Sequence, residues 1–62
     1  MQKQKSGGTY FEHLRLGNYY KIVAIDANTG VEVTVMGPAN GNIKRLEDIA
    51  LRKLNMRLEK GY

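Results

Sequence analysis

The chain contains no cysteine, no tryptophan, a single proline and a single histidine among its 62 residues. Without cysteine it can form neither a disulfide framework nor a cysteine-based zinc site, the devices that most often stabilise domains of this size. A domain this short buries only about 60% of the surface that its unfolded chain exposes, so its core must be small. Tight packing or association with another chain must therefore stabilise the fold.

Long hydrophobic runs are also missing. No apolar run approaches the roughly 18 residues that cross a bilayer, and residues 1–8 lack the hydrophobic stretch of a signal peptide. We therefore expect a cytoplasmic protein. Apolar residues make up 42% and charged residues 26% of the chain, which is a globular composition. The sequence predicts a flexible basic tail over residues 1–8, with Lys3 and Lys5, and one domain over residues 9–62.

Three segments have the composition and alternation of β-strands: residues 9–16, 19–26 and 31–36. The first ends at Gly17-Asn18, a pair suited to a two-residue type II′ turn in which glycine takes a positive φ. The second ends at Asp26, whose side chain can cap the following turn. Because the loops are short, the strands should form an antiparallel meander.

A helix should follow from about Ile43 to about Glu59. The segment 37–41, which carries the proline and two glycines, is expected to end the sheet before it. Asn42 or Asn40 is the candidate N-cap. An apolar stripe about 140° wide is expected to face the core: Ile43, Leu46, Ala50, Leu51, Leu54 and Leu58. The predicted fold class is α+β, a three-stranded antiparallel β-meander with one C-terminal helix packed on one face (βββα).

The loop lengths pair Leu16 with Tyr19 and Ile22 with Val35, and this register sorts the strand residues into two faces. One face carries Phe11, His13, Arg15, Tyr20, Ile22, Ala24, Val31, Val33 and Val35. The other carries Tyr10, Glu12, Leu14, Leu16, Tyr19, Lys21, Val23, Ile25, Glu32, Thr34 and Met36. The pattern does not decide which face the helix covers.

Both faces are largely apolar, and one helix can cover only one of them. A large apolar patch left in water usually marks an interaction surface. We expect a non-enzymatic interaction module, a homodimer or the binder of another protein, whose interface holds Tyr10, Leu14, Leu16, Tyr19, Val23, Ile25 and Met36. A register shifted by one residue, half-exposed tyrosines, or a tail folded over the face are the alternatives. Ile49 and Met56, nearly opposite the core stripe, could form a second, weaker contact.

The side chains that carry most catalysis are scarce. With one histidine, one serine and no cysteine, the chain offers no nucleophile, base and orienting group that would converge. His13 shares a face with Phe11 and Ile22, where a packed histidine is expected. The carboxylates are dispersed along the chain, without the spacing of a metal site. We therefore expect no enzyme, no cofactor and no metal.

The formal net charge of +4 makes nucleic acid the alternative partner. Proteins that read DNA with a sheet need arginine and lysine on its exposed face, whereas each face here offers one such residue, Arg15 or Lys21. The other positive charges lie in the tail and on the helix. Nucleic-acid binding is thus the less favoured hypothesis, and its candidate contacts are Arg45, Arg52, Lys53, Arg57 and Lys60.

Several segments in order resemble a family of short alphaproteobacterial proteins of unknown function. They are Gly17-Asn18, Ala24-Ile25-Asp26, Thr29-Gly30-Val31-Glu32-Val33, Gly37-Pro38-Ala39 and Ala50-Leu51-Arg52-Lys53-Leu54. The resemblance covers most of the chain after the tail, but no segment is a catalytic motif. It implies a small bacterial cytoplasmic protein, and it supplies no activity, cofactor or site.

Overall fold

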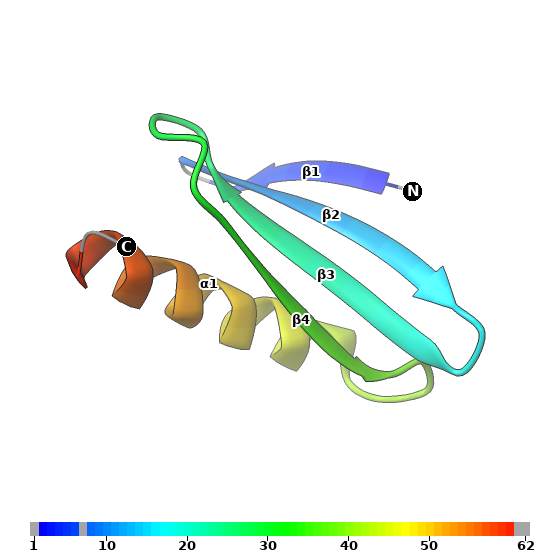
Figure 1. Cartoon of the computed structure of the whole chain (residues 1–62). Helices are drawn as coiled ribbons and strands as arrows, with labels where there is room; N and C mark the ends of the chain where they lie inside the picture. The colour runs from blue at the N-terminus through cyan, green and yellow to red at the C-terminus, as the bar shows by residue number, and fades with distance from the viewer. Residues whose placement is uncertain (1, 7, 61–62) are drawn as a thin grey trace.

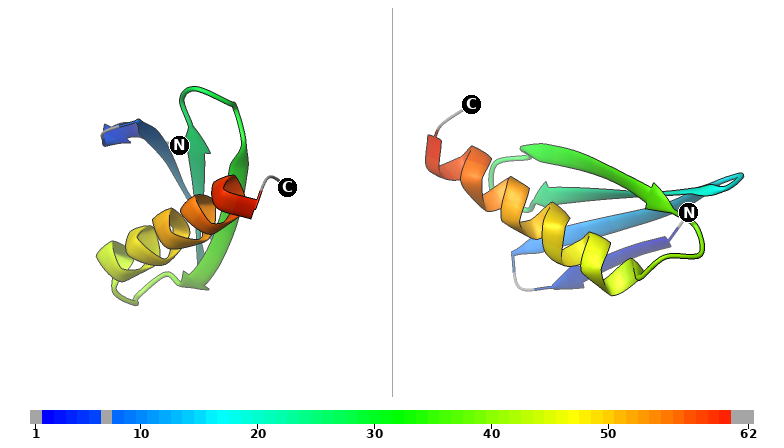
Figure 2. Two further views of the ribbon diagram at one scale, coloured as in Figure 1. Left: turned by 90° about the vertical axis from the view of Figure 1, so that its left-hand side faces the viewer. Right: turned by 90° about the horizontal axis from the view of Figure 1, so that it is seen from below.

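The fold is an antiparallel sheet with one helix across one of its faces (Figure 1). This computed structural model describes residues 2–6 and 8–60, and side chains from residue 8 onward. The elements are β1 (Gln2–Ser6), β2 (Thr9–Leu16), β3 (Tyr19–Asp26), β4 (Glu32–Pro38) and α1 (Ile43–Lys60). The strand order is β1-β2-β3-β4. Over β2, β3, β4 and α1 the predicted βββα arrangement is confirmed, and the end-on view in Figure 2 shows the helix on one side of the sheet.

Strand β1 is an addition to the predicted sheet. Its residues 2–6 were expected in a flexible tail, but the structure pairs them antiparallel with β2, from Gln2 opposite His13 to Ser6 opposite Thr9. Met1 and Gly7, assigned to the same tail, lie outside the described residues. A polar, lysine-containing segment can join a sheet at its edge, because edge pairing needs backbone hydrogen bonds and no apolar side chains. A search for apolar alternation therefore overlooks it.

The register of the central strands is the predicted one. Leu16 lies opposite Tyr19, and Ile22 lies opposite Val35. Gly17 has a φ of +60°, and no described residue other than glycine has a positive φ, so the β2–β3 turn is type II′ as expected. In the β3–β4 turn the Asp26 carboxylate accepts hydrogen bonds from the Thr29 N–H (3.0 Å) and hydroxyl (2.9 Å).

Strand β4 continues two residues further than expected, through Gly37 and Pro38. The Ala39 N–H donates to the Asn18 carbonyl at 2.8 Å, whereas the Pro38 carbonyl accepts from the Gly41 N–H at 3.0 Å. Backbone groups alternate sides along a strand, so the Pro38 nitrogen lies on the edge of β4 that pairs with no other strand. Its missing N–H disrupts no pairing there, which is why the proline does not end the sheet.

The helix begins where the asparagine cap predicts. Of the two candidates, Asn42 is the N-cap, because its side-chain oxygen accepts from the Arg45 N–H at 3.1 Å. The N-terminal half of α1 lies close to β4 at Gly37, where an added Cβ would lie 2.8 Å from Leu46 Cδ2. Only glycine lets the helix pack this closely against the strand without displacing the leucine.

The core lies between α1 and the sheet face that carries Phe11, Ile22, Ala24 and Val35. Six apolar side chains are buried there: Phe11, Ile22, Ala24, Val35, Ala50 and Leu54. The remaining stripe residues of α1 pack against this cluster. Ile49 also packs against this cluster, although it was expected to lie opposite the core. The reason is that α1 contacts β4 as well as β3, so a wider part of the helix surface faces the sheet.

Candidate interaction surfaces

The sheet face opposite α1 carries all seven residues predicted for an interface. Pairing places Tyr10 beside Ile25, Leu16 beside Tyr19, and Met36 beside Lys21 on this face. We call it the outer sheet face, and its apolar members are Tyr10, Leu14, Leu16, Tyr19, Val23, Ile25 and Met36. Among the described elements none covers it (Figure 2).

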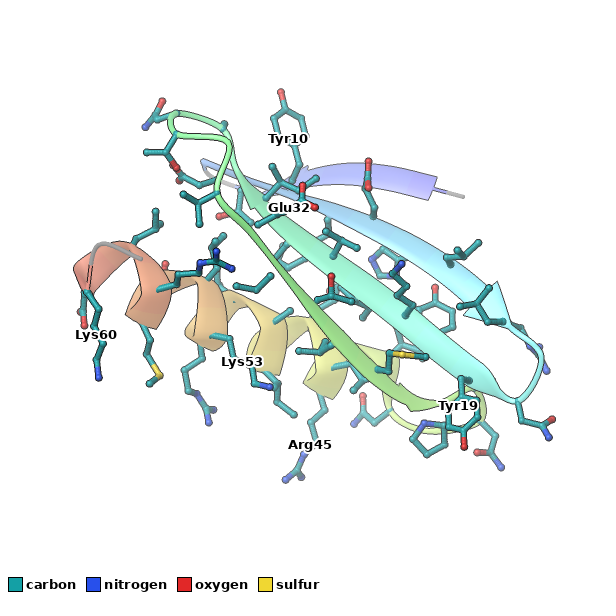
Figure 3. All side chains as sticks on the ribbon, in the orientation of Figure 1. Tyr10, Tyr19, Glu32, Arg45, Lys53 and Lys60 are labelled. Atoms are coloured by element: carbon teal, nitrogen blue, oxygen red, sulfur yellow. The ribbon has the colours of Figure 1, made fainter. Side chains whose placement is uncertain are left out.

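Exposure is concentrated at one end of the outer sheet face. Leu16, Tyr19 and Met36 expose 46%, 59% and 54% of their surface, whereas the other four apolar residues are half-buried by their neighbours. Leu16 and Tyr19 flank the β2–β3 turn, and Met36 lies near the same end of the sheet on β4, opposite Lys21. Figure 3 shows Tyr19 at this end and Tyr10 toward the other. The sequence predicted the face, but alternation alone cannot predict which of its members the neighbouring side chains cover.

Two opposite charges lie in the middle of this apolar face. Glu12 is opposite Val23 and Lys21 is opposite Leu14, so the two charged residues are diagonal neighbours across β2 and β3. Both are half-buried. With Glu32, which lies opposite Ile25, the face carries two acidic groups and one basic group among its apolar side chains.

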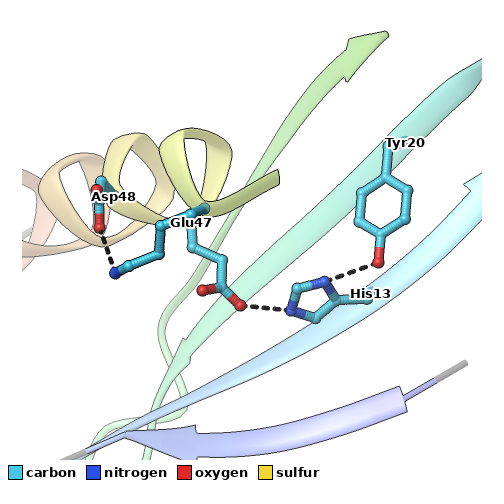
Figure 4. Close-up of polar contacts among 5 residues, drawn as sticks. His13, Tyr20, Glu47 and Asp48 are labelled. Atoms are coloured by element: carbon cyan, nitrogen blue, oxygen red, sulfur yellow. Dashed lines mark hydrogen bonds and ion pairs between the residues drawn. The ribbon is translucent and has the colours of Figure 1, made fainter. Parts of the chain in front are cut away.

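A polar cluster links the sheet to the helix on the other side. His13 from β2, whose side chain is 9% exposed, places Nδ1 2.9 Å from the Tyr20 hydroxyl and Nε2 2.7 Å from Glu47 Oε2 (Figure 4). The Nε2 contact lacks the direction of a good hydrogen bond, so we describe it as an electrostatic contact. The rings of His13 and Tyr20 meet edge to face, with centroids 5.6 Å apart.

The sequence placed His13 on the packed face and missed its partner on α1. A signal was available, because Glu47 lies four residues after Ile43 and four before Leu51, within the core-facing stripe. The next residue, Asp48, points elsewhere and pairs with Lys44 at 3.0 Å. This hydrogen-bonded carboxylate raises the pKa of Lys44 above 10.5. Across the described part of the chain, no three histidine, aspartate or glutamate side chains gather as a metal site would require.

The cations proposed as nucleic-acid contacts are exposed along α1, and three of them share a groove. Arg45 and Lys60 extend away from the sheet in Figure 3. Between the C-terminal half of α1 and β4 lies a groove of about 360 Å³, lined by Val33, Lys53, Met56, Arg57 and Lys60. We call it the basic groove. Arg45 and Arg52 do not line it. Sequence reasoning missed the groove because it does not show how the helix flank meets β4.

The helix α1 is too polar to span a membrane, and no other helix occurs in residues 2–6 and 8–60.

A family model described as a domain of unknown function (DUF6898) matches residues 6–61. No curated protein and no solved structure matches the chain.

Proposed function

Because the chain belongs to the DUF6898 family, which is a family of unknown function, we propose its function from the structure: a small non-enzymatic interaction module that forms a homodimer through the outer sheet face. A bacterial, cytoplasmic setting, with the alphaproteobacterial origin that the sequence resemblance implies, belongs to the same proposal. One observation carries it, namely the exposed apolar cluster of Leu16, Tyr19 and Met36 on a sheet face that the helix leaves open.

Burial of this cluster would stabilise an associated state. Burying an apolar side chain completely contributes about 1.5–3 kcal/mol, so the exposed half of each of these three contributes about 1 kcal/mol in each copy. The small core, with six buried apolar side chains among the described residues, also favours association, because a domain of this size gains little stability from its own interior.

A second copy is the occupant that fits the charges of the face. In a twofold arrangement the same patch meets itself, so the apolar residues pack together and Lys21 of one copy can approach the acidic side chains on the face of the other. A partner of strongly acidic or basic character would leave either Glu12 or Lys21, both half-buried, facing a like charge.

Solution mass tests the proposal. Sedimentation velocity over a range of micromolar concentrations should show a species of twice the 7.0 kDa chain mass. Met36→Lys should shift this equilibrium to the monomer, because a cation in the apolar interface is costly to desolvate. Met56→Lys is the matched control: Met56 is 50% exposed, close to the 54% of Met36, but lies on α1.

Equal effects of the two lysine variants would contradict the proposed interface, and a wild-type chain that stays monomeric at every concentration would contradict the dimer. Circular dichroism of both variants checks that each remains folded.

A further inference from the structure

The basic groove combines an apolar floor with a cationic rim. Val33 from β4 and Met56 from α1 contribute apolar surface, and Met56 is half-exposed. Lys53, Arg57 and Lys60 contribute three cationic groups, whose aliphatic stems extend the apolar surface. A volume of about 360 Å³ accommodates a few side chains of a partner.

Between residues 8 and 60, the acidic side chains of α1 and β4 lie away from this groove. Of the three carboxylates of α1, Glu47 contacts His13 and Asp48 pairs with Lys44. At about 100° per residue, Asp48 and Glu59 lie more than about 100° around the helix from the centre of the groove-lining residues. On β4, Glu32 is the neighbour of Val33 and so lies on the opposite face of the sheet. Among the residues that the structure describes, the lining of the groove is therefore cationic and contains no acidic residue.

Arg57 is held in place at the wall of the groove. Its Nη1 donates to the backbone carbonyl of Glu32 at 3.1 Å, which joins the helix to β4. Lys53 and Lys60, in contrast, are exposed helix residues about two turns apart along the rim. The two lysines can turn toward an incoming anion at little structural cost.

We propose that the basic groove binds an acidic peptide segment that carries an apolar side chain. The apolar side chain packs on Val33 and Met56, and the flanking carboxylates pair with Lys53 and Lys60. Nucleic acid fits the groove less well, because its lining within residues 8–60 holds no aromatic residue on which a base could stack. This site is separate from the outer sheet face, so it does not depend on the proposed dimer.

A designed peptide tests the site by fluorescence anisotropy. The probe is a fluorescein-labelled peptide with one central leucine flanked on each side by two glutamates and a glycine. From exposed ion pairs and one partly buried leucine we expect a dissociation constant on the order of 100 µM. Replacing the leucine of the peptide by serine, or its glutamates by glutamines, should each weaken binding about fivefold or more.

Variants of the protein locate the site. Lys53→Glu should weaken binding of the peptide about fivefold, whereas Arg52→Glu, the adjacent exposed cation outside the lining, should change it less than twofold. The two substitutions change the net charge equally. Met56→Ser should weaken binding, and Met36→Ser should not, even if it alters the oligomeric state.

Three results would overturn the proposal: no binding of the leucine peptide, equal effects of Lys53→Glu and Arg52→Glu, or equal binding of the peptides with leucine and serine. The same assay with a labelled DNA duplex and with phosphatidylglycerol vesicles identifies the competing classes. Tighter binding of either, lost in Lys53→Glu, would assign the groove to nucleic acid or to membrane surfaces instead.

Discussion

His13 shows how a single polar residue joins three elements of a small domain. It comes from β2, its hydroxyl partner Tyr20 from β3, and its carboxylate partner Glu47 from α1. A buried polar group is costly unless it is paired. Here the Tyr20 hydroxyl is hydrogen-bonded to Nδ1, and the Glu47 carboxylate lies 2.7 Å from Nε2 as an electrostatic neighbour. The cluster thereby favours one position of the helix over the sheet.

Removal of the carboxylate tests this role. Glu47→Ala should lower the free energy of unfolding by about 1–2 kcal/mol, because it leaves His13 Nε2 without its neighbour in a site that is 9% exposed. Asp48→Ala, the adjacent carboxylate in an exposed pair with Lys44, should lower it by no more than about 0.5 kcal/mol. Urea unfolding of both variants measures the difference, and equal losses would mean that the His13 contact contributes no special stability.

The elements that local patterns specify were predictable, and those that depend on pairing alone were not. The type II′ turn at Gly17 and the helix over 43–60 follow from residue preference and apolar spacing. Strand β1 and the extension of β4 to Pro38 have no apolar alternation. Both belong to edge strands, and backbone hydrogen bonds are enough to pair an edge strand with its neighbour. The extent of the edge strands is therefore the part of the fold that is hardest to predict from this sequence.

The helix start offers a test at the scale of an element. Asn42→Ala should lower the free energy of unfolding by about 1 kcal/mol, because the Arg45 N–H loses its acceptor. Asn40→Ala changes the other asparagine that the sequence offered as a cap, and it should have little effect. Thermal unfolding of the two variants distinguishes them. A larger loss of stability for Asn40→Ala would contradict the assignment of Asn42 as the N-cap.

The stability of the whole molecule depends on a core in which six of the described apolar side chains are buried. Leu54→Ala removes most of one fully buried side chain and should cost about 2–5 kcal/mol. This is comparable to the 3–5 kcal/mol that a single core of this size supplies, so the variant should be largely unfolded at 37 °C. Circular dichroism measures the loss, with Met56→Ala as an exposed control expected to stay within about 0.5 kcal/mol. A folded Leu54→Ala domain would show that stability comes mainly from elsewhere.

For the candidate surfaces, the sequence could predict which face of a single element a residue lies on, but not how neighbouring elements meet. Strand parity placed Tyr19 and Met36 on the same face, and the structure adds that both are exposed at the turn end. The basic groove was not foreseen, because it forms between a helix and an edge strand, and helical spacing places residues on a helix without showing what lies beside them. Glu47 was missed for the same reason.

The position of α1 on the inner sheet face determines how many acidic segments a dimer could bind at once. If two copies stack on their outer sheet faces, the layers follow the order helix, sheet, sheet, helix, and both helices are outermost. Each pair would then display two basic grooves on opposite sides. A partner with two acidic segments joined by a linker long enough to reach around the pair would bind with avidity, whereas the separated chain would bind each segment singly.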